Sequence, residues 1–182
     1  MKKLLLSLVF VFAMCATCFA AKVEPAATSS KIFQDSEYKI SVQLPEGFDY
    51  ADEEGPDVVV AADDKKGATY NVVAVEADPK EVAAATNKDL LKDIVDKQDR
   101  KLLLDNGLEL YHEYTVKINP DHVGYFMDGY VKGNGDNGRV KTSIIIFYHN
   151  NKKFTVTLKA PYEQKGYLKS FKRFRTSITC KN

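Results

Sequence analysis

Three histidines and one late cysteine are the side chains of this sequence best suited to nucleophilic catalysis. His112, His122 and His149 are well separated along the chain, and no recognised catalytic motif surrounds any of them. Cys180 lies in the last few residues, where we expect an exposed thiol without a catalytic role. A hydrolase triad is assembled in space and not in sequence, so the fold would have to bring such groups together. The sequence itself gives no positive evidence for an enzyme.

Acidic side chains gather in one segment that could be considered for metal binding. They are Asp49, Asp52, Glu53, Glu54 and Asp57. Calcium needs about six to eight converging oxygen ligands, and the segment lacks the spacing of an EF-hand. After residue 20 the chain also lacks a His-x-x-x-His motif and a closely spaced cysteine pair. We therefore expect a solvated acidic loop, with weak calcium binding left open, and we assign no metal site and no cofactor.

His112 has the most unusual predicted position of the three histidines. It falls on the apolar phase of a predicted strand, between Leu110 and Tyr114. A histidine there can be a pH-responsive or ligand-facing group. The alternative, which we favour, is a hydrogen-bonded histidine of the core or of a sheet end.

Aromatic residues are numerous, with ten tyrosines and ten phenylalanines but no tryptophan. Many of them fall on predicted strands: Tyr111, Tyr114, Tyr125, Phe126, Tyr130, Phe147 and Tyr148. An aromatic sheet face could line a pocket for a small ligand. More commonly such residues form the core, and tyrosine takes sheet edges where its hydroxyl reaches water.

A basic helix face near the end of the chain is the main candidate binding surface. The predicted helix has an apolar stripe, in which Phe171 is expected to face the sheet, and its basic residues lie around that stripe. The basic residues are Lys165, Lys169, Lys172 and Arg173. They could contact an acidic partner, although an amphipathic helix also needs charged residues on its solvated face.

Residues 1–20 have the three-part pattern of a cleavable secretory signal peptide. Lys2 and Lys3 provide the positive start, an apolar run covers residues 4–13, and small residues precede a cut before Ala21. The apolar run is too short for a transmembrane anchor, which needs about 20 residues. We therefore expect an exported protein, located in the periplasm or outside the cell.

The remaining 162 residues suit one domain, expected at 37–179 after a flexible leader at 21–36. Removal of the signal leaves 24 basic and 25 acidic residues, a net charge of −1. No overall field then favours nucleic acid or an anionic membrane. Cys180 is the only cysteine left, so an internal disulfide is excluded. We expect a monomer stabilised by packing alone.

Alternation of apolar and polar residues predicts seven strands, at 38–44, 57–62, 69–77, 108–118, 123–132, 139–148 and 154–160. Helical spacing predicts one helix from Thr86 or Asn87 to Asn106 and a closing helix over 165–178. Residues 139–148 are apolar on both faces, which indicates a central strand. Short turns indicate antiparallel pairing. The predicted class is α+β, with a single antiparallel sheet of about six to seven strands and helices packed on it.

Three segments of the pattern resemble the PsbP-like fold family. A strand runs into Leu44-Pro45-Glu46-Gly47-Phe48, a later strand runs from Phe154 to Pro161, and the closing helix carries Ser170-Phe171. This family includes the photosystem II extrinsic proteins, Mog-type Ran-binding proteins and DcrB-like bacterial exported proteins. The resemblance implies an α/β/α sandwich and an accessory or binding role without shared catalytic residues.

Together these features predict an exported, non-enzymatic accessory or binding protein of the cell envelope, with an envelope protein as its partner. Two alternatives stay open. One is a periplasmic carrier that holds a small ligand on an aromatic sheet face, and the other is an uncharacterised hydrolase. The predicted binding residues are Lys165, Lys169, Lys172, Arg173 and His112.

Processing of the signal peptide is directly testable. N-terminal sequencing of the exported protein is expected to begin near Ala21, because cleavage follows small residues. Lipid attached to Cys15 or Cys18, or an intact Met1 on exported material, would contradict this expectation.

Overall fold

The computed structural model describes residues 31–52, 55–120, 122–132, 138–162, 168–174 and 176–181. The expected signal peptide, most of the expected leader, Glu53, Glu54 and Lys165 lie outside these residues. The described strands form two antiparallel sheets, one of seven strands in the order β3-β4-β5-β9-β8-β7-β6 and one of three in the order β1-β2-β10. The strands are β1 (Ile32–Asp35), β2 (Ile40–Gln43), β3 (Asp49–Tyr50), β4 (Val58–Asp63), β5 (Thr69–Glu76), β6 (Leu108–Asn119), β7 (His122–Lys132), β8 (Arg139–His149), β9 (Lys152–Pro161) and β10 (Ile178–Cys180).

The helical segments lie between β5 and β6 and before β10. They are α2 (Pro79–Ala84), α3 (Lys88–Val95), the π-helical segment η1 (Asp96–Arg100), α4 (Lys101–Asp105) and α5 (Leu168–Phe174). Asn87 caps α3 by accepting hydrogen bonds from the backbone of Asp89 and Leu90, as its side chain predicts. Among the described residues, no helix has the length and apolarity to cross a bilayer.

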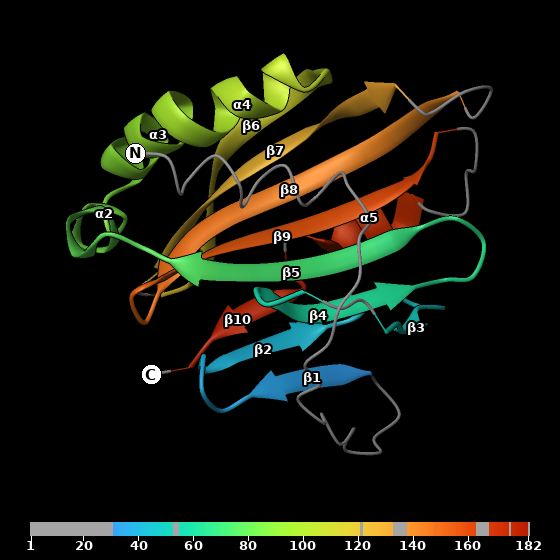
Figure 1. The fold of residues 1–182 in the computed structure, drawn as a ribbon, viewed down its shortest axis with the longest axis horizontal. Helices are drawn as coiled ribbons and strands as arrows, with labels where there is room; N and C mark the ends of the chain where they lie inside the picture. Colours follow the sequence, from blue (N-terminus) through green and yellow to red (C-terminus); the bar gives the residue numbers. More distant parts are fainter. Residues whose placement is uncertain are drawn as a thin grey trace.

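Three layers result from this arrangement (Figure 1). Helices α3 and α4 cover one face of the large sheet, and the small sheet and α5 lie against the other face. Each interface has its own apolar core. Leu91, Val95 and Ile146 belong to the helix-side core, whereas Phe154 and Phe174 belong to the core facing the small sheet. The predicted α+β class is therefore confirmed.

Strand β8 is the central element of these layers. It pairs with β7 and β9, and every residue from Thr142 to His149 is buried. Ile145 and Phe147 contribute to one core, while Ile144 and Ile146 contribute to the other. The apolar character of both faces of this segment predicts such double coverage, and the structure confirms it.

A tight turn joins β8 to β9. Asn150 and Asn151 both have positive φ, at 48° and 58°. Asparagine tolerates this left-handed backbone better than most residues, and two such residues in succession match the right-handed twist of a two-residue hairpin. The turn places His149 directly opposite Lys152, at one end of the large sheet.

The N-terminal strands and the end of the chain pair with each other instead of joining the large sheet. β2 lies between β1 and β10, and the backbone of Gln43 donates a 2.6 Å hydrogen bond to the carbonyl of Ser177. The predicted strand at 38–44 thus belongs to a second, smaller sheet. Part of the expected leader, Ile32–Asp35, forms β1.

The closing helix is shorter than predicted. It ends at Phe174, and Ile178, expected on its apolar stripe, lies in β10. Ser177 ends the helical turn by donating from Oγ to the carbonyl of Phe174 at 2.7 Å, and its Oγ lies 2.9 Å from the Tyr70 hydroxyl. Pairing of β10 with β2 also buries Cys180, so the expectation of an exposed tail thiol is wrong.

Phe174 offers a direct test of how α5 holds the two layers together. Its side chain is 1% exposed and contacts the rings of Tyr70 and Phe126. We expect Phe174→Ala to lower the free energy of unfolding by about 3–5 kcal/mol, measured by urea denaturation, because a large buried cavity results. Leu90→Ala is the control, since Leu90 is 48% exposed and should cost below about 0.5 kcal/mol. Equal losses for both variants would contradict the packing described.

Candidate functional site

The structure describes only part of the predicted basic face. Lys169 and Lys172 belong to α5, and Arg173 is exposed near its end. A groove of about 460 Å³ separates this end of α5 from the loop that follows β2, and Arg173, Ser170 and Lys31 contribute to its lining. The Lys31 ammonium already binds the Phe48 carbonyl and the Asp49 carboxylate. Of the predicted basic residues, Arg173 therefore lies beside a groove, and Lys31, which was not among them, is engaged within the protein.

Phe171 packs between α5 and the large sheet, as predicted. It is partly buried against the core that faces the small sheet. The Lys141 ammonium lies 4.6 Å from the centroid of its ring, a cation–π distance. The apolar side of α5 thus serves packing, whatever its basic side binds.

His112 is exposed, so of the two favoured positions, in the core or at a sheet end, the core position is wrong. Strand β6 has an irregularity in its pairing with β7 between Leu110 and His112. A bulge adds one residue to one strand, which changes the face to which later side chains point. Simple alternation along 108–118 could not reveal this shift, and His112 joins no cluster of ligand-binding atoms in the described residues.

Three tyrosines form an aromatic row at one end of the large sheet. Tyr111 lies on β6, Tyr130 lies on β7 and Tyr162 directly follows β9, and we call these three residues the tyrosine surface. Ring centroids are 4.8 Å apart for Tyr111 and Tyr130 and 4.6 Å apart for Tyr130 and Tyr162, both in edge-to-face geometry. Tyr111 is 56% exposed and Tyr162 is 51% exposed. Few large apolar groups of the described chain are so open to solvent.

Charged groups border the tyrosine surface. The Arg139 guanidinium lies 5.8 Å from the Tyr130 ring centroid, and its Nη2 donates to Glu109 Oε2 at 2.5 Å. On the neighbouring strands β7 and β8, Asp128 accepts a 2.6 Å hydrogen bond from Ser143 Oγ. An aromatic centre with an arginine and a polar border is the composition enriched at protein–protein interfaces.

The other strand aromatics serve the interior. Tyr125, Phe126, Phe147 and Tyr148 are buried in the two cores. Tyr114 is 39% exposed and packs on Phe126. The predicted aromatic residues therefore separate into a buried set and a small exposed set, and they do not form one continuous aromatic floor.

A second cluster joins residues that the sequence left unconnected. His122 Nε2 and His149 Nδ1 are 2.9 Å apart, and the ligand atoms of His122, His149 and Cys180 all lie within 4.8 Å of one another. His122 begins β7 and His149 ends β8, whose register places them opposite, two residues beyond the Gly124–Phe147 pair. Symmetric pairing of β7 with β8 in a hairpin could have predicted from the sequence that the two histidines lie opposite each other. Cys180 comes close to the two histidines only because β10 pairs with β2.

The cluster places a thiol of raised pKa beside an imidazole of lowered pKa. Burial raises the pKa of Cys180 to about 12. Burial, then His122 and then the charge of Lys39 lower the pKa of His149, and the backbone of Lys181 and Lys39 opposes this only partly. A nucleophilic cysteine needs a thiolate stabilised by nearby positive charge. The raised pKa of the thiol argues against cysteine catalysis by this cluster.

A buried ion pair lies under the helices. Asp99, in the π-helical segment η1, is 3% exposed and pairs with the Lys153 ammonium from β9. Burial raises the pKa of Asp99, and Lys153 opposes that rise. The adjoining cavity is about 40 Å³, far below the roughly 300–1,000 Å³ of ligand pockets. This pair therefore connects the helical layer to the sheet and gives no room for a small ligand.

Comparisons with solved structures identify the fold. The chain is similar to the solution structure of cyanobacterial PsbP (CyanoP) from Synechocystis sp. PCC 6803, with a TM-score of 0.60, 17% identity, and coverage of 91% of this chain and 98% of that one. A Bacteroides thetaiotaomicron VPI-5482 structure gives a TM-score of 0.50, 14% identity, and coverage of 85% and 50%. The Ran-binding protein Mog1p of Saccharomyces cerevisiae gives a TM-score of 0.48 and 12% identity, with coverage of 82% of this chain and 85% of that one.

The chain therefore has the PsbP-like fold, which confirms the resemblance drawn from its sequence. No family model and no curated protein matches the sequence. Identities this low show a shared fold and leave the function to be argued from the sites.

The buried histidine predicts a pH dependence of stability. Because the folded pKa of His149 is lowered from 6.5, the unfolded chain binds more protons below about pH 6.5, and stability falls as the pH falls through that value. We expect urea denaturation between pH 5 and 7 to show this slope, at most about 1.4 kcal/mol per pH unit for one proton. His149→Gln should flatten the slope, whereas His112→Gln, at an exposed site, should retain it. An identical slope in all three proteins would contradict the assignment.

Proposed function

We propose that the chain is an exported, non-enzymatic accessory protein of the cell envelope that binds a partner protein through the tyrosine surface. The observation that carries the proposal is the exposed edge-to-face row of Tyr111, Tyr130 and Tyr162, bordered by Arg139. Tyrosine and arginine are the residues that most often dominate the binding energy of interfaces.

The positions of these residues suit a preformed interface. Tyr130 pairs with Glu109 across β7 and β6, and Tyr111 lies within β6 at the irregularity between Leu110 and His112, so neither residue stands on a loop. Mutual ring contacts limit the rotamers available to each side chain. A surface that is already ordered loses less conformational entropy when a partner binds, which increases affinity for a given contact area.

The partner need not carry a strong opposite charge. Arg139 is paired with Glu109, and the chain as a whole is close to neutral. Binding would then depend mainly on aromatic burial, with the bordering charges setting orientation and the rate of association. This differs from the basic face of α5, where binding would depend strongly on salt.

Export remains part of the proposal and rests on residues 1–20. A positive start, an apolar run and small residues before Ala21 support secretion into the periplasm or beyond the cell. The PsbP-like fold is compatible with this role, because the chain is similar over most of its length to cyanobacterial PsbP. The fold alone does not select a partner.

The two alternative functions have weaker support. A carrier of small ligands would need an enclosed cavity beside the aromatic face, whereas the tyrosine surface is open to solvent. A hydrolase would need an activated nucleophile near a histidine. Cys180 does lie near two histidines, but its burial raises the pKa of the thiol.

The test is affinity capture from a cell-envelope extract with matched variants. The double variant Tyr111→Ala/Tyr162→Ala should retain the fold, since both side chains are more than half exposed, and should lose capture of the partner by about tenfold or more. Captured proteins are quantified by mass spectrometry, and folding is checked by circular dichroism.

Two controls define the outcome. Tyr50→Ala removes a tyrosine that is 40% exposed on β3, away from the tyrosine surface, and should leave capture unchanged. Lys169→Glu/Lys172→Glu reverses charge on α5 and should also leave capture unchanged at high and at low salt. Loss of capture by the α5 variant alone would transfer the binding role to the basic face and reject the tyrosine surface.

A further inference from the structure

His122, His149 and Cys180 form the one group of at least three possible metal ligands found among the described residues. Two imidazole nitrogens and one thiol converge from β7, β8 and β10, with ligand atoms separated by no more than 4.8 Å. His149 is 6% exposed and Cys180 is 8% exposed, while His122 is only partly buried. The cluster is therefore mostly shielded from water but accessible from one side.

The spacing of these atoms is close to that of a transition-metal site. With metal–nitrogen bonds of about 2.0–2.1 Å and metal–sulfur bonds of about 2.3 Å, tetrahedral ligand atoms lie roughly 3.3–3.6 Å apart. The observed spacing is close to this range, since the two nitrogens are 2.9 Å apart and all three ligand atoms lie within 4.8 Å of one another. Small side-chain rotations would bring all three donors to a common ion.

A buried nitrogen of the cluster also fits coordination. His149 Nε2 is buried, and no acceptor among the described residues reaches it in hydrogen-bond geometry, although the backbone of Lys39 and Lys181 lies near enough to raise the pKa of the ring. If Nδ1 bound a metal, the imidazole proton would stay on Nε2, beside that backbone. Metal-bound histidines usually direct their second nitrogen to such an outer group.

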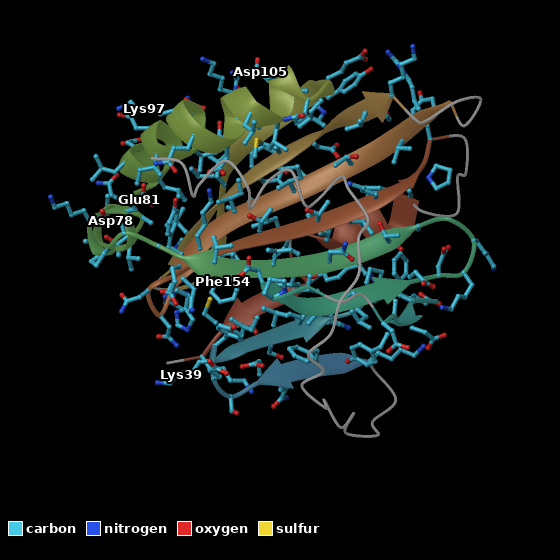
Figure 2. All side chains as sticks on the ribbon, viewed as in Figure 1. Lys39, Asp78, Glu81, Lys97, Asp105 and Phe154 are labelled. Carbon is cyan, nitrogen blue, oxygen red and sulfur yellow. The ribbon has the colours of Figure 1, made fainter. Side chains whose placement is uncertain are left out.

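The surroundings provide an entry path. A cavity of about 290 Å³ lies beside the two histidines, and Lys39, Tyr148, Asn150 and Lys181 contribute to its lining. Figure 2 shows Lys39 at the β1–β2 turn, next to the end of β10. Water or a small anion could reach a metal from this side and supply a fourth ligand.

The donor types select the class of ion. One thiolate and two neutral imidazoles suit Zn²⁺ or Cu⁺, whereas Mg²⁺ and Ca²⁺ require oxygen ligands. Binding would displace the thiol proton of Cys180 to solvent, because the thiolate is the ligand.

From these observations we infer that His122, His149 and Cys180 form a binding site for one thiophilic transition-metal ion, Zn²⁺ or Cu⁺, which links the small sheet to the large one. The ion would connect β10 with the ends of β7 and β8. Cys180 is the only cysteine after residue 20, so no disulfide can form within that part of the chain, and the ion would add a cross-link to the packing. Binding only to the folded chain would raise thermal stability.

The experiment uses the full chain with Cys15→Ser/Cys18→Ser, so that Cys180 is the only thiol. The reduced, metal-free protein is titrated with Co²⁺, a spectroscopic substitute for Zn²⁺, and the Co²⁺ is then displaced with Zn²⁺. We expect one equivalent to bind, with a thiolate-to-cobalt charge-transfer band and an apparent Kd below about 1 µM. Cu⁺ is tested separately by competition with a colorimetric Cu⁺ chelator.

Three further variants, each made in that background, separate coordination from folding. Cys180→Ser should abolish the charge-transfer band, and His122→Gln should weaken binding by about 100-fold or more. His112→Gln is the matched control and should bind as the reference does, because His112 is exposed and outside the cluster. Circular dichroism of the metal-free proteins verifies that each variant folds.

Thermal unfolding gives a second readout. One equivalent of the bound ion should raise the Tm of the reference and His112→Gln chains by several degrees and leave that of the other two variants unchanged. Stabilisation by Zn²⁺ alone or by Cu⁺ alone identifies the ion. If neither ion binds, or if Cys180→Ser and His122→Gln bind as tightly as the reference, the site is rejected.

Discussion

Double-sided burial of β8 is the constraint on which the rest of the structure depends. Residues 142–149 are all buried, so both faces of the sheet at this strand must be covered by apolar layers. Figure 1 shows how the chain meets this requirement, with α3 and α4 on one side and α5 with the small sheet on the other. Burial of apolar surface contributes about 25 cal/mol per Å², which makes these two interfaces the main source of stability.

Coverage of the sheet is incomplete, and the candidate functional surfaces lie at its margins. The tyrosine surface occupies the end of the large sheet near the start of β6 and the end of β9, where Tyr111 and Tyr162 stay exposed. The histidine–cysteine cluster lies toward the opposite end of β7 and β8, where β10 meets the large sheet. The doubly covered centre provides rigidity, and the two ends provide groups that can meet other molecules.

The last strand, β10, also contributes to the stability of the fold. β10 contributes only three residues, but it buries Ile178 and Cys180 and pairs with β2. The adjacent Ser177 connects α5 and the core through Phe174 and Tyr70. Without a disulfide, this corner depends on hydrogen bonds and packing, and a bound ion would strengthen it where the two sheets meet.

Local sequence determined most strands of the large sheet, the cap at Asn87, the Asn150-Asn151 turn and the double burial of β8, because each depends on neighbouring residues and on periodicity. It also carried the resemblance to the PsbP-like fold. Three features were decided only by tertiary structure. The bulge that exposes His112 arises from pairing between β6 and β7. The formation of β10 at 178–180, where only Ile178 was expected to be helical, depends on pairing with β2, and so do the burial of Cys180 and its approach to His122 and His149. Contacts between residues so far apart in the chain follow from the packing of the two sheets, which no local pattern specifies.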